Sequence, residues 1–387
     1  TEFNNIMWGW VLAVILLGTG LLYGITMGFP QVRCFGHIIR SLKSTLKSDE
    51  GSVSGFAALC AAVGGQVGTG SLVGVASALA AGGPGALFWM WITAVFGMVL
   101  SFGEATLGQV FHEKDKDGNY YGGSPYYMTK GLGNKPLAIA YAITTIFAVG
   151  VCIAMLQNNS ITSAVTGVVN ISPWIPGIIV TIITAVIVLG GVKRITDAAS
   201  LIVPFMAVGY ILITIIIIIT HLSEVPAMFG TFMTTIIICS CTGFAILLTG
   251  ALESGQDGVN LVQAAFSSML GQVGSYFVLL VTFLFCFTTL IADLFYGEVG
   301  VRYLFKGSAN GADKAVKVFQ VIALILVTIG AALPLPVLWD LVDFCVAFLV
   351  FFNVYALLRL RKYVKYVLDD YLMQFNSGKS EPVWDES

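Results

Sequence analysis

Charged side chains are scarce in this sequence: Asp, Glu, Lys and Arg together make up 10% of its 387 residues. A soluble domain carries about 25%, and the mean hydropathy of +0.90 points in the same direction. The scarcity argues against an ordinary soluble domain and favours a chain embedded in a lipid bilayer. The formal net charge of −2 gives no electrostatic reason to expect nucleic acid as a partner.

Histidine and cysteine are also sparse. The three histidines are scattered, and the seven cysteines lie mostly within apolar runs without a CxxC pair. This distribution argues against a metal centre built from these side chains and against a disulfide framework. Because no nucleophile–base pair stands out either, we expect a protein that is not an enzyme.

Long apolar runs, by contrast, recur along nearly the whole chain. About 20 apolar residues cross the hydrocarbon core of a bilayer, and Pro, Gly and charged residues separate the runs. We therefore predict an all-α polytopic membrane protein. The ten expected spans are 8–28, 53–80, 85–111, 136–158, 174–191, 197–221, 227–250, 272–300, 318–332 and 336–358.

The 19 basic residues fall into five clusters that lie between or after the spans. Lys and Arg prefer the cytoplasmic side of a membrane. With ten crossings, the first three clusters share one side and the last two lie on the other. One more crossing between about residues 221 and 230 would put every basic loop and the C-terminus in the cytoplasm, with the N-terminus outside. The charges therefore predict that one helix is absent from the middle of the chain.

The order of the spans agrees with this gap, because five spans precede it after residue 53 and four follow it. Transporters built from inverted repeats carry an interrupted helix at the same position of each half. The expected organisation is an extra N-terminal transmembrane helix at 1–30, a cytoplasmic amphipathic helix at 31–50, a first five-helix repeat at 51–225, an incomplete four-helix second repeat at 226–362 and a cytoplasmic tail at 363–387. We expect the tail to be disordered from Asp369 onward.

A Gly-rich stretch, GGQVGTGS at 64–71, interrupts one of the apolar runs. Unwound backbone at membrane depth occurs where it lines a polar cavity or is buried in protein. Its free N–H groups attract a carboxylate, and its carbonyl oxygens can hold Na⁺. The stretch therefore suits a small zwitterion and a hard cation. The candidate ligands within it are Gln66, Gly68, Thr69 and Gly70 for the zwitterion and Ser71 for the cation.

Residues 64–71 admit two other interpretations. Small residues also serve close helix packing, although four glycines and a glutamine exceed what packing needs. A phosphate-binding loop would require a Lys that this stretch lacks. The cavity interpretation is therefore favoured.

Seven stretches spread over the chain resemble the alanine/glycine:cation symporter family. They are SGFAALCAAVGGQVGTGSLVGVASALAAGGPGALFWMW at 54–91, GEATLGQVF at 103–111, GGSPYYMTKGLG at 122–133, LQNNSI at 156–161, LGGVKRITDAASLIVPFMA at 189–207, VQAAFSS at 262–268 and FTTLIADLFYGE at 287–298. The resemblance implies a LeuT-type bundle of five-plus-five inverted repeats behind one extra N-terminal helix. It also implies uptake of a small neutral amino acid, such as alanine or glycine, driven by Na⁺ or H⁺ across the cell membrane, by a protein that we expect to be a monomer.

The resemblance further implies particular ligands. The amides of Thr69 and Gly70 would face the substrate carboxylate, and Gln157 would add a polar side chain to the substrate pocket. The implied cation ligands are the carbonyls of Gly64, Val67 and Phe285 and the hydroxyls of Thr288 and Thr289. A pair of adjacent Thr hydroxyls can equally bond to carbonyls one turn earlier in its own helix.

One departure from the family pattern falls at the gap that the charges predict. Family members carry a second broken helix, with an Asn-Glu-Ala-Gly-type stretch, between the counterparts of Phe205 and Phe229. This chain passes from HLSEVPAM at 221–228 directly to a stretch that resembles the next helix. Two alternatives to a working symporter therefore stay open: a non-transporting remnant, and a channel in which GGQVGTGS is the filter.

Two carboxylates, Glu104 and Asp293, fall inside predicted spans. Such groups are costly and are functional by default. A proton relay is one interpretation, and a paired or capped group is the other. Pairing is favoured for Glu104, and both interpretations stay open for Asp293.

Overall fold

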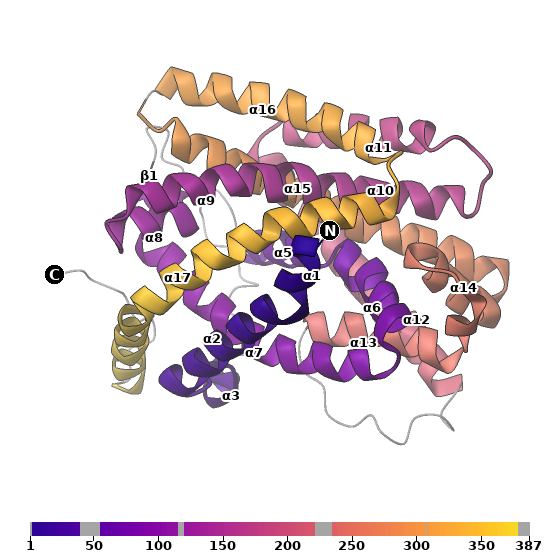
Figure 1. Cartoon of the computed structure of the whole chain (residues 1–387), viewed down its shortest axis with the longest axis horizontal. Coiled ribbons are helices and arrows are strands. Elements are labelled where there is room, and N and C mark those ends of the chain that lie inside the picture. Colours follow the sequence, from indigo (N-terminus) through magenta and orange to yellow (C-terminus); the bar gives the residue numbers. More distant parts are fainter. Residues whose placement is uncertain (1, 39–54, 115–119, 221–233, 308, 378–387) are drawn as a thin grey trace.

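Helices make up almost all of the chain in the computed structural model, which describes residues 2–38, 55–114, 120–220, 234–307 and 309–377 (Figure 1). The first half contains α1 (Glu2–Ile6), the π-helical turn η1 (Met7–Val11), α2 (Leu12–Met27), α3 (Pro30–Arg33), α5 (Gly55–Gln66), the π-helical turn η2 (Gly70–Gly74), α6 (Val75–Gly82), α7 (Gly85–Val110), α8 (Ser124–Lys130), α9 (Lys135–Phe147), the π-helical turn η3 (Ala148–Ile153), α10 (Ala154–Thr166), α11 (Trp174–Val188) and α12 (Val192–Thr220). Between α7 and α8, β1 (Glu113–Lys114) and β2 (Tyr120–Tyr121) form an antiparallel pair.

The second half contains α13 (Thr234–Leu248), the 3₁₀ turn η5 (Ala251–Ser254), α14 (Gly258–Leu270), α15 (Gln272–Leu304), α16 (Ala309–Gly330) and α17 (Leu335–Asn376). Each of the ten predicted spans overlaps a helix. Six helices of the described chain are long and apolar enough to cross a membrane, or seven if the bent pair α5–α6 counts as one span. The chain is therefore a multi-pass membrane protein. The other matches are weaker, because α11 and α13 are short and α16 begins with charged residues.

The core is organised around α15, which runs through the middle of the molecule (Figure 1). Its most apolar 18-residue window is 72% buried, against 17–39% for the other spanning helices. It packs against α5, α9, α10, α12, α14 and α16. Helices that face lipid bury only one stripe, whereas α15 is covered on nearly all sides. Its polar residues are therefore held inside the bundle.

The last helix differs from the prediction. Helix α17 continues to Asn376, so residues 369–376, expected to be disordered, are helical. The reason is that an apolar stripe continues beyond the predicted end of the span: Leu360, Val364 and Leu368 are buried. An ion pair between Lys365 and Asp369, 2.7 Å apart and one turn from each other, adds local support.

Two helices were not predicted as elements, namely α8 and α14. The segment 251–262 falls between two predicted spans, and α14 begins within it, where the side chain of Asp257 accepts a hydrogen bond from the amide of Gly258 at 2.6 Å. The amphipathic helix predicted at 31–50 is described only as far as residue 38, and its remainder lies outside the described residues. The gap predicted near residues 221–230 also lies outside them.

Candidate functional site

The Gly-rich stretch breaks its helix, as predicted. Helix α5 ends at Gln66 and η2 begins at Gly70, and the two halves meet at an angle of 44°. Between them the backbone leaves the helical path at Val67 and Gly68. The break lies inside the protein, because Val67 and Thr69 are 1% and 0% exposed. The polar groups released by the break therefore have to find partners within the bundle.

The partner of Thr69 is Gln157 of α10. Both the backbone N–H and the hydroxyl of Thr69 donate to Gln157 Oε1, at 2.9 Å and 2.7 Å. The hydroxyl of Ser160, one turn further along α10, lies 3.1 Å from Thr69 Oγ1. The N–H of Thr69, expected to be free for a substrate carboxylate, is thus occupied by a side-chain oxygen in this structure. The physical reason is that a buried donor without a partner is costly.

On the other side of the break, oxygen atoms of α5 and α15 gather. Thr289 Oγ1 donates to the carbonyl oxygen of Gly64 at 2.7 Å and to that of Phe285 at 3.1 Å. Thr288 Oγ1 bonds to the same Phe285 oxygen at 3.0 Å. Hydroxyl and carbonyl oxygens are the ligands that hard cations prefer, so this donor set fits Na⁺ chemically. The Thr hydroxyls also make the bonds one turn earlier in their own helix that the alternative interpretation predicts.

Gly68 is the point where the two sides meet. A Cβ atom added at Gly68 would lie 2.5 Å from Thr289 Oγ1 and 2.8 Å from Gln157 Oε1. No real Cβ atom comes this close to either group, so only glycine lets the backbone pass between α10 and α15. The structure thus brings together Gly64, Gly68, Thr69, Gln157, Phe285, Thr288 and Thr289, with Val67 buried in the break.

Three of the predicted ligands lie elsewhere. Gln66 and Gly70 are exposed, and a Cβ at Gly70 would meet nothing within 4 Å. Ser71 faces α13, where its carbonyl oxygen accepts a hydrogen bond from Thr242 Oγ1 at 2.9 Å. Gln66 and Gly70 are each two residues from Gly68, a spacing that places side chains on different faces of a helix.

The sequence did not single out Ser160 and Cys286, which both contact Thr69. A signal for Ser160 existed, because it follows Gln157 by three residues and therefore shares its face of α10. The intervening Asn158 and Asn159 point elsewhere and bond to backbone carbonyls of α11, α16 and the turn after α16. Only part of the LQNNSI motif therefore belongs to the site.

Glu104, the first of the two carboxylates within predicted spans, is paired. Its Oε1 accepts a hydrogen bond from Asn353 Nδ2 of α17 at 2.5 Å. Asn353 in turn accepts from the hydroxyl of Tyr127 in α8. This hydrogen bond supports the favoured interpretation of Glu104 as a capped or paired group.

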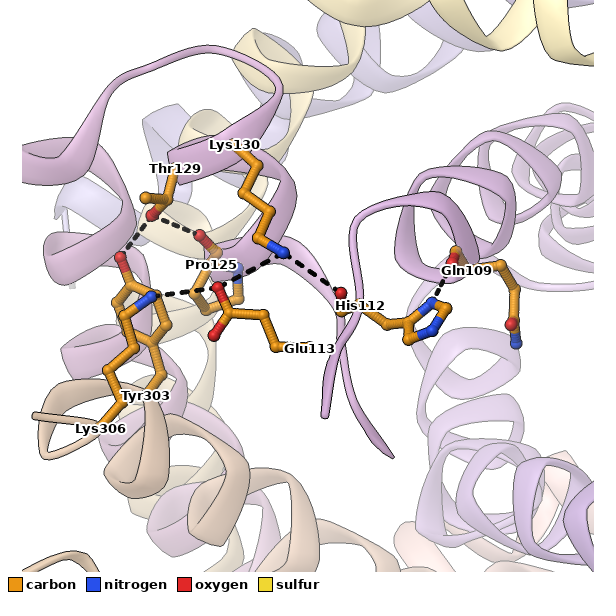
Figure 2. Close-up of polar contacts among 8 residues, drawn as sticks. All are labelled: Gln109, His112, Glu113, Pro125, Thr129, Lys130, Tyr303 and Lys306. Atoms are coloured by element: carbon orange, nitrogen blue, oxygen red, sulfur yellow. Dashed lines mark hydrogen bonds and ion pairs between the residues drawn. The ribbon is translucent and has the colours of Figure 1, made fainter. Parts of the chain in front are cut away.

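A second polar cluster joins the β1–β2 pair to α8 and to the end of α15 (Figure 2). Glu113 Oε1 lies 3.6 Å from Lys130 Nζ and 3.3 Å from Lys306 Nζ. The neighbouring Tyr126 is buried, and this desolvation, with the nearby Glu113 carboxylate, raises the pKa of its phenol well above the usual range. Both lysines remain partly exposed, so these ion pairs link surface segments to one another and the cluster does not resemble a ligand site. An open surface hollow of about 670 Å³ lies alongside, lined by Thr106, Gln109, Val110, Phe111, His112, Lys130 and Val367.

Comparison with known proteins finds relatives that align with nearly the whole chain. "Putative sodium/proton-dependent alanine carrier protein YrbD" of Bacillus subtilis is 32% identical over an alignment of 459 residues that covers 99% of this chain and 94% of the relative. "Sodium/alanine symporter AgcS" of Methanococcus maripaludis is 29% identical over 88% of this chain and 89% of the relative. "Amino-acid carrier protein AlsT" of Bacillus subtilis is 28% identical over 97% of this chain and 92% of the relative.

The alignment of 459 residues is longer than this chain, which has 387. Tens of alignment positions therefore hold no residue of this chain. The model of the sodium:alanine symporter family matches in two segments, residues 1–231 and 226–386, which between them span nearly the whole sequence. This chain belongs to the sodium:alanine symporter family.

Proposed function

We propose that this protein is a secondary active symporter that moves a small neutral amino acid, such as alanine or glycine, across the cell membrane together with Na⁺. The observation that carries the proposal is the broken helix between α10 and α15. On one side of Gly68, the Thr69 N–H and hydroxyl suit a carboxylate. On the other, oxygens of Gly64, Phe285 and Thr289 suit a cation.

The proposal includes the organisation implied by the resemblance, with inverted repeats at 51–225 and 226–362 and one extra helix in front. In this arrangement the broken helix α5–α6 is the first helix of the first repeat. The basic clusters put the loops and the C-terminus in the cytoplasm and the N-terminus outside. The names of the relatives, which mention sodium, proton and alanine, support the same substrate class and leave Na⁺ and H⁺ as the two ions to compare.

A second candidate function is supported by one observation. The two segments matched by the family model meet at residues 226–231, where the charge pattern and the motif order predict an absent helix. In the LeuT-type arrangement that helix supplies the opposite wall of the substrate cavity. A chain without it would keep the scaffold and the cation ligands but would not alternate access, and it would be a non-transporting remnant of a symporter.

The test is uptake of labelled L-alanine by the purified chain in proteoliposomes. We expect accumulation that is driven by an inward Na⁺ gradient and saturates with alanine; accumulation driven by a proton gradient alone would assign H⁺ as the coupling ion. If alanine binds but no gradient drives uptake, the chain is a remnant. A conductance that does not saturate would instead identify a channel.

A further inference from the structure

Asp293 is a buried carboxylate on the face of α15 that contacts the break. It follows Thr289 by four residues and Cys286 by seven, spacings that put all three on one side of a helix. Cys286 contacts Thr69 and Thr289 contacts Gly64, so this side faces the broken helix. Asp293 is 3% exposed, and its Oδ2 atom is buried without a hydrogen-bond partner.

The Gln157 side chain links this carboxyl group to Thr69. Its amide oxygen accepts the two hydrogen bonds from Thr69, and the same side chain lies beside the carboxyl group of Asp293. A carboxylate only accepts hydrogen bonds, so the amide nitrogen of Gln157 is the group that faces it. The amide therefore lies between two donors on Thr69 and an acceptor on Asp293.

An α-amino acid presents the same polarity. Its carboxylate oxygen accepts hydrogen bonds and its ammonium nitrogen donates them. Two carbon atoms separate this oxygen from the nitrogen, whereas one carbon atom separates them in an amide. Within the described chain, Asp293 enters no ion pair. A buried charge without an opposite charge is expensive, and such a group inside a membrane marks a ligand or ion path.

We propose that Asp293 binds the ammonium group of the transported amino acid, and that the Gln157 amide holds the place of the substrate's polar groups until the substrate arrives. This inference rests on the proposed function and adds a residue to it. The substrate carboxylate replaces Gln157 Oε1 at Thr69, and the ammonium group replaces Gln157 Nε2 at Asp293. The ammonium group supplies a positively charged partner for the Asp293 carboxylate, which has no such partner within the described chain.

The first test is binding of labelled L-alanine to the purified chain in Na⁺-containing buffer, with Asp293→Asn as the variant. Asn keeps the shape of the side chain and removes its charge. We expect alanine affinity to fall at least tenfold. L-Lactate has a hydroxyl in place of the ammonium group. Its affinity, measured by competition with labelled alanine, should change less than threefold. Asp313→Asn is the control, because Asp313 carries the same charge at an exposed position outside the site, and it should bind alanine like the unmodified chain.

A structural role for Asp293 makes different predictions. If Asp293 only positions Gln157, Asp293→Asn weakens alanine and lactate equally, and that result overturns the proposal. Alanine affinity unchanged in Asp293→Asn also overturns it while leaving the proposed function intact. If the unmodified chain binds no small amino acid, the proposed function fails and this inference fails with it.

A second variant covers the case in which Asp293→Asn does not fold. Gln157→Ala removes the amide that occupies the site and leaves both Thr69 and Asp293 without it. We expect a lower melting temperature without ligand and a larger increase on adding alanine than in the unmodified chain, because the ligand then satisfies groups that are otherwise unpaired. Lactate should give a smaller increase than alanine. Equal increases with alanine and lactate would overturn the proposal.

Discussion

The hydroxyl of Thr289 donates to the carbonyl oxygen of Gly64 across 2.7 Å, and this contact joins α15 to the last turn of α5 before the break. In the proposed function both oxygens are Na⁺ ligands. Thr289→Val keeps the volume of the side chain and removes its oxygen. We expect the Na⁺ concentration for half-maximal alanine uptake to rise at least tenfold. An unchanged Na⁺ dependence in proteoliposomes would exclude Thr289 as a ligand.

Thr282 is the matched control for that substitution. It lies two turns earlier in α15 and is 0% exposed, and its Oγ1 is buried without a hydrogen-bond partner. Thr282→Val therefore removes a buried polar atom that makes no hydrogen bond in the folded protein. We expect an increase in stability of about 1 kcal/mol, seen as a higher melting temperature, with Na⁺ dependence unchanged. A lower melting temperature would mean that this hydroxyl has a partner after all.

Gly68 should tolerate no side chain. Gly68→Ala would force a Cβ to within 2.5 Å of Thr289 Oγ1, so we expect loss of both alanine uptake and Na⁺ binding. Gly97→Ala in α7 is the control, because a Cβ there meets nothing within 4 Å and alanine favours a helix more than glycine does. Uptake by the Gly68→Ala variant at half the normal rate or more would show that α10 and α15 can separate at this point.

Asn159 stabilises the end of α16. Its Nδ2 lies 3.0 Å, 3.3 Å and 2.8 Å from the carbonyl oxygens of Gly330, Ala331 and Leu333, where a helix leaves its last carbonyls unpaired. Asn159→Leu should cost about 2 kcal/mol, because buried acceptors lose their donor. The measurement is thermal unfolding in detergent, with the exposed Asn170→Ala as the control. Equal melting temperatures for the two variants would contradict this role.

Arg302 makes one buried and one exposed ion pair at the end of α15. It lies 2.9 Å from Glu298, whose side chain is 4% exposed, and 2.9 Å from Asp313, whose side chain is 63% exposed. Arg302→Met leaves the Glu298 carboxylate buried with Gln320 as its other partner, and we expect a loss of roughly 2–4 kcal/mol. Asp313→Asn should cost less than about 1 kcal/mol. Comparable melting temperatures for the two variants would refute the distinction.

Hydropathy and glycine content were enough to predict the helical membrane fold and the position of the break. Both depend on local sequence, because a span needs a continuous apolar run and a break needs residues that tolerate irregular backbone. Helix α14 was missed for a related reason. The segment before it contains Gly, Ser and acidic residues that are typical of a loop, although Asp257 followed by apolar residues at 259, 262 and 266 is the pattern of a capped amphipathic helix.

The contacts of the site were harder to predict. The oxygen that accepts the hydrogen bond from the Thr69 N–H belongs to Gln157, 88 residues further along the chain. No local sequence pattern specifies such a pair. The sequence shows Asp293 as a carboxylate within a predicted span, but its position beside Gln157 depends on how α10 and α15 pack. Packing also explains why Ser71, adjacent in sequence to the other candidates, faces α13.

The two halves of the broken helix are fastened to different neighbours: Gly64 to α15 through Thr289, and Ser71 to α13 through Thr242. If α13 rotated relative to α15, the two half-helices would rotate relative to each other. Because the helix is interrupted between them, the backbone torsion angles of Val67 and Gly68 would change. In the proposed function, the same two residues separate the donors that bind the carboxylate from the oxygens that bind the cation. Turning one half of the helix against the other would thus change the distance between the two sets of ligands, which couples bundle rotation to the fit of both solutes.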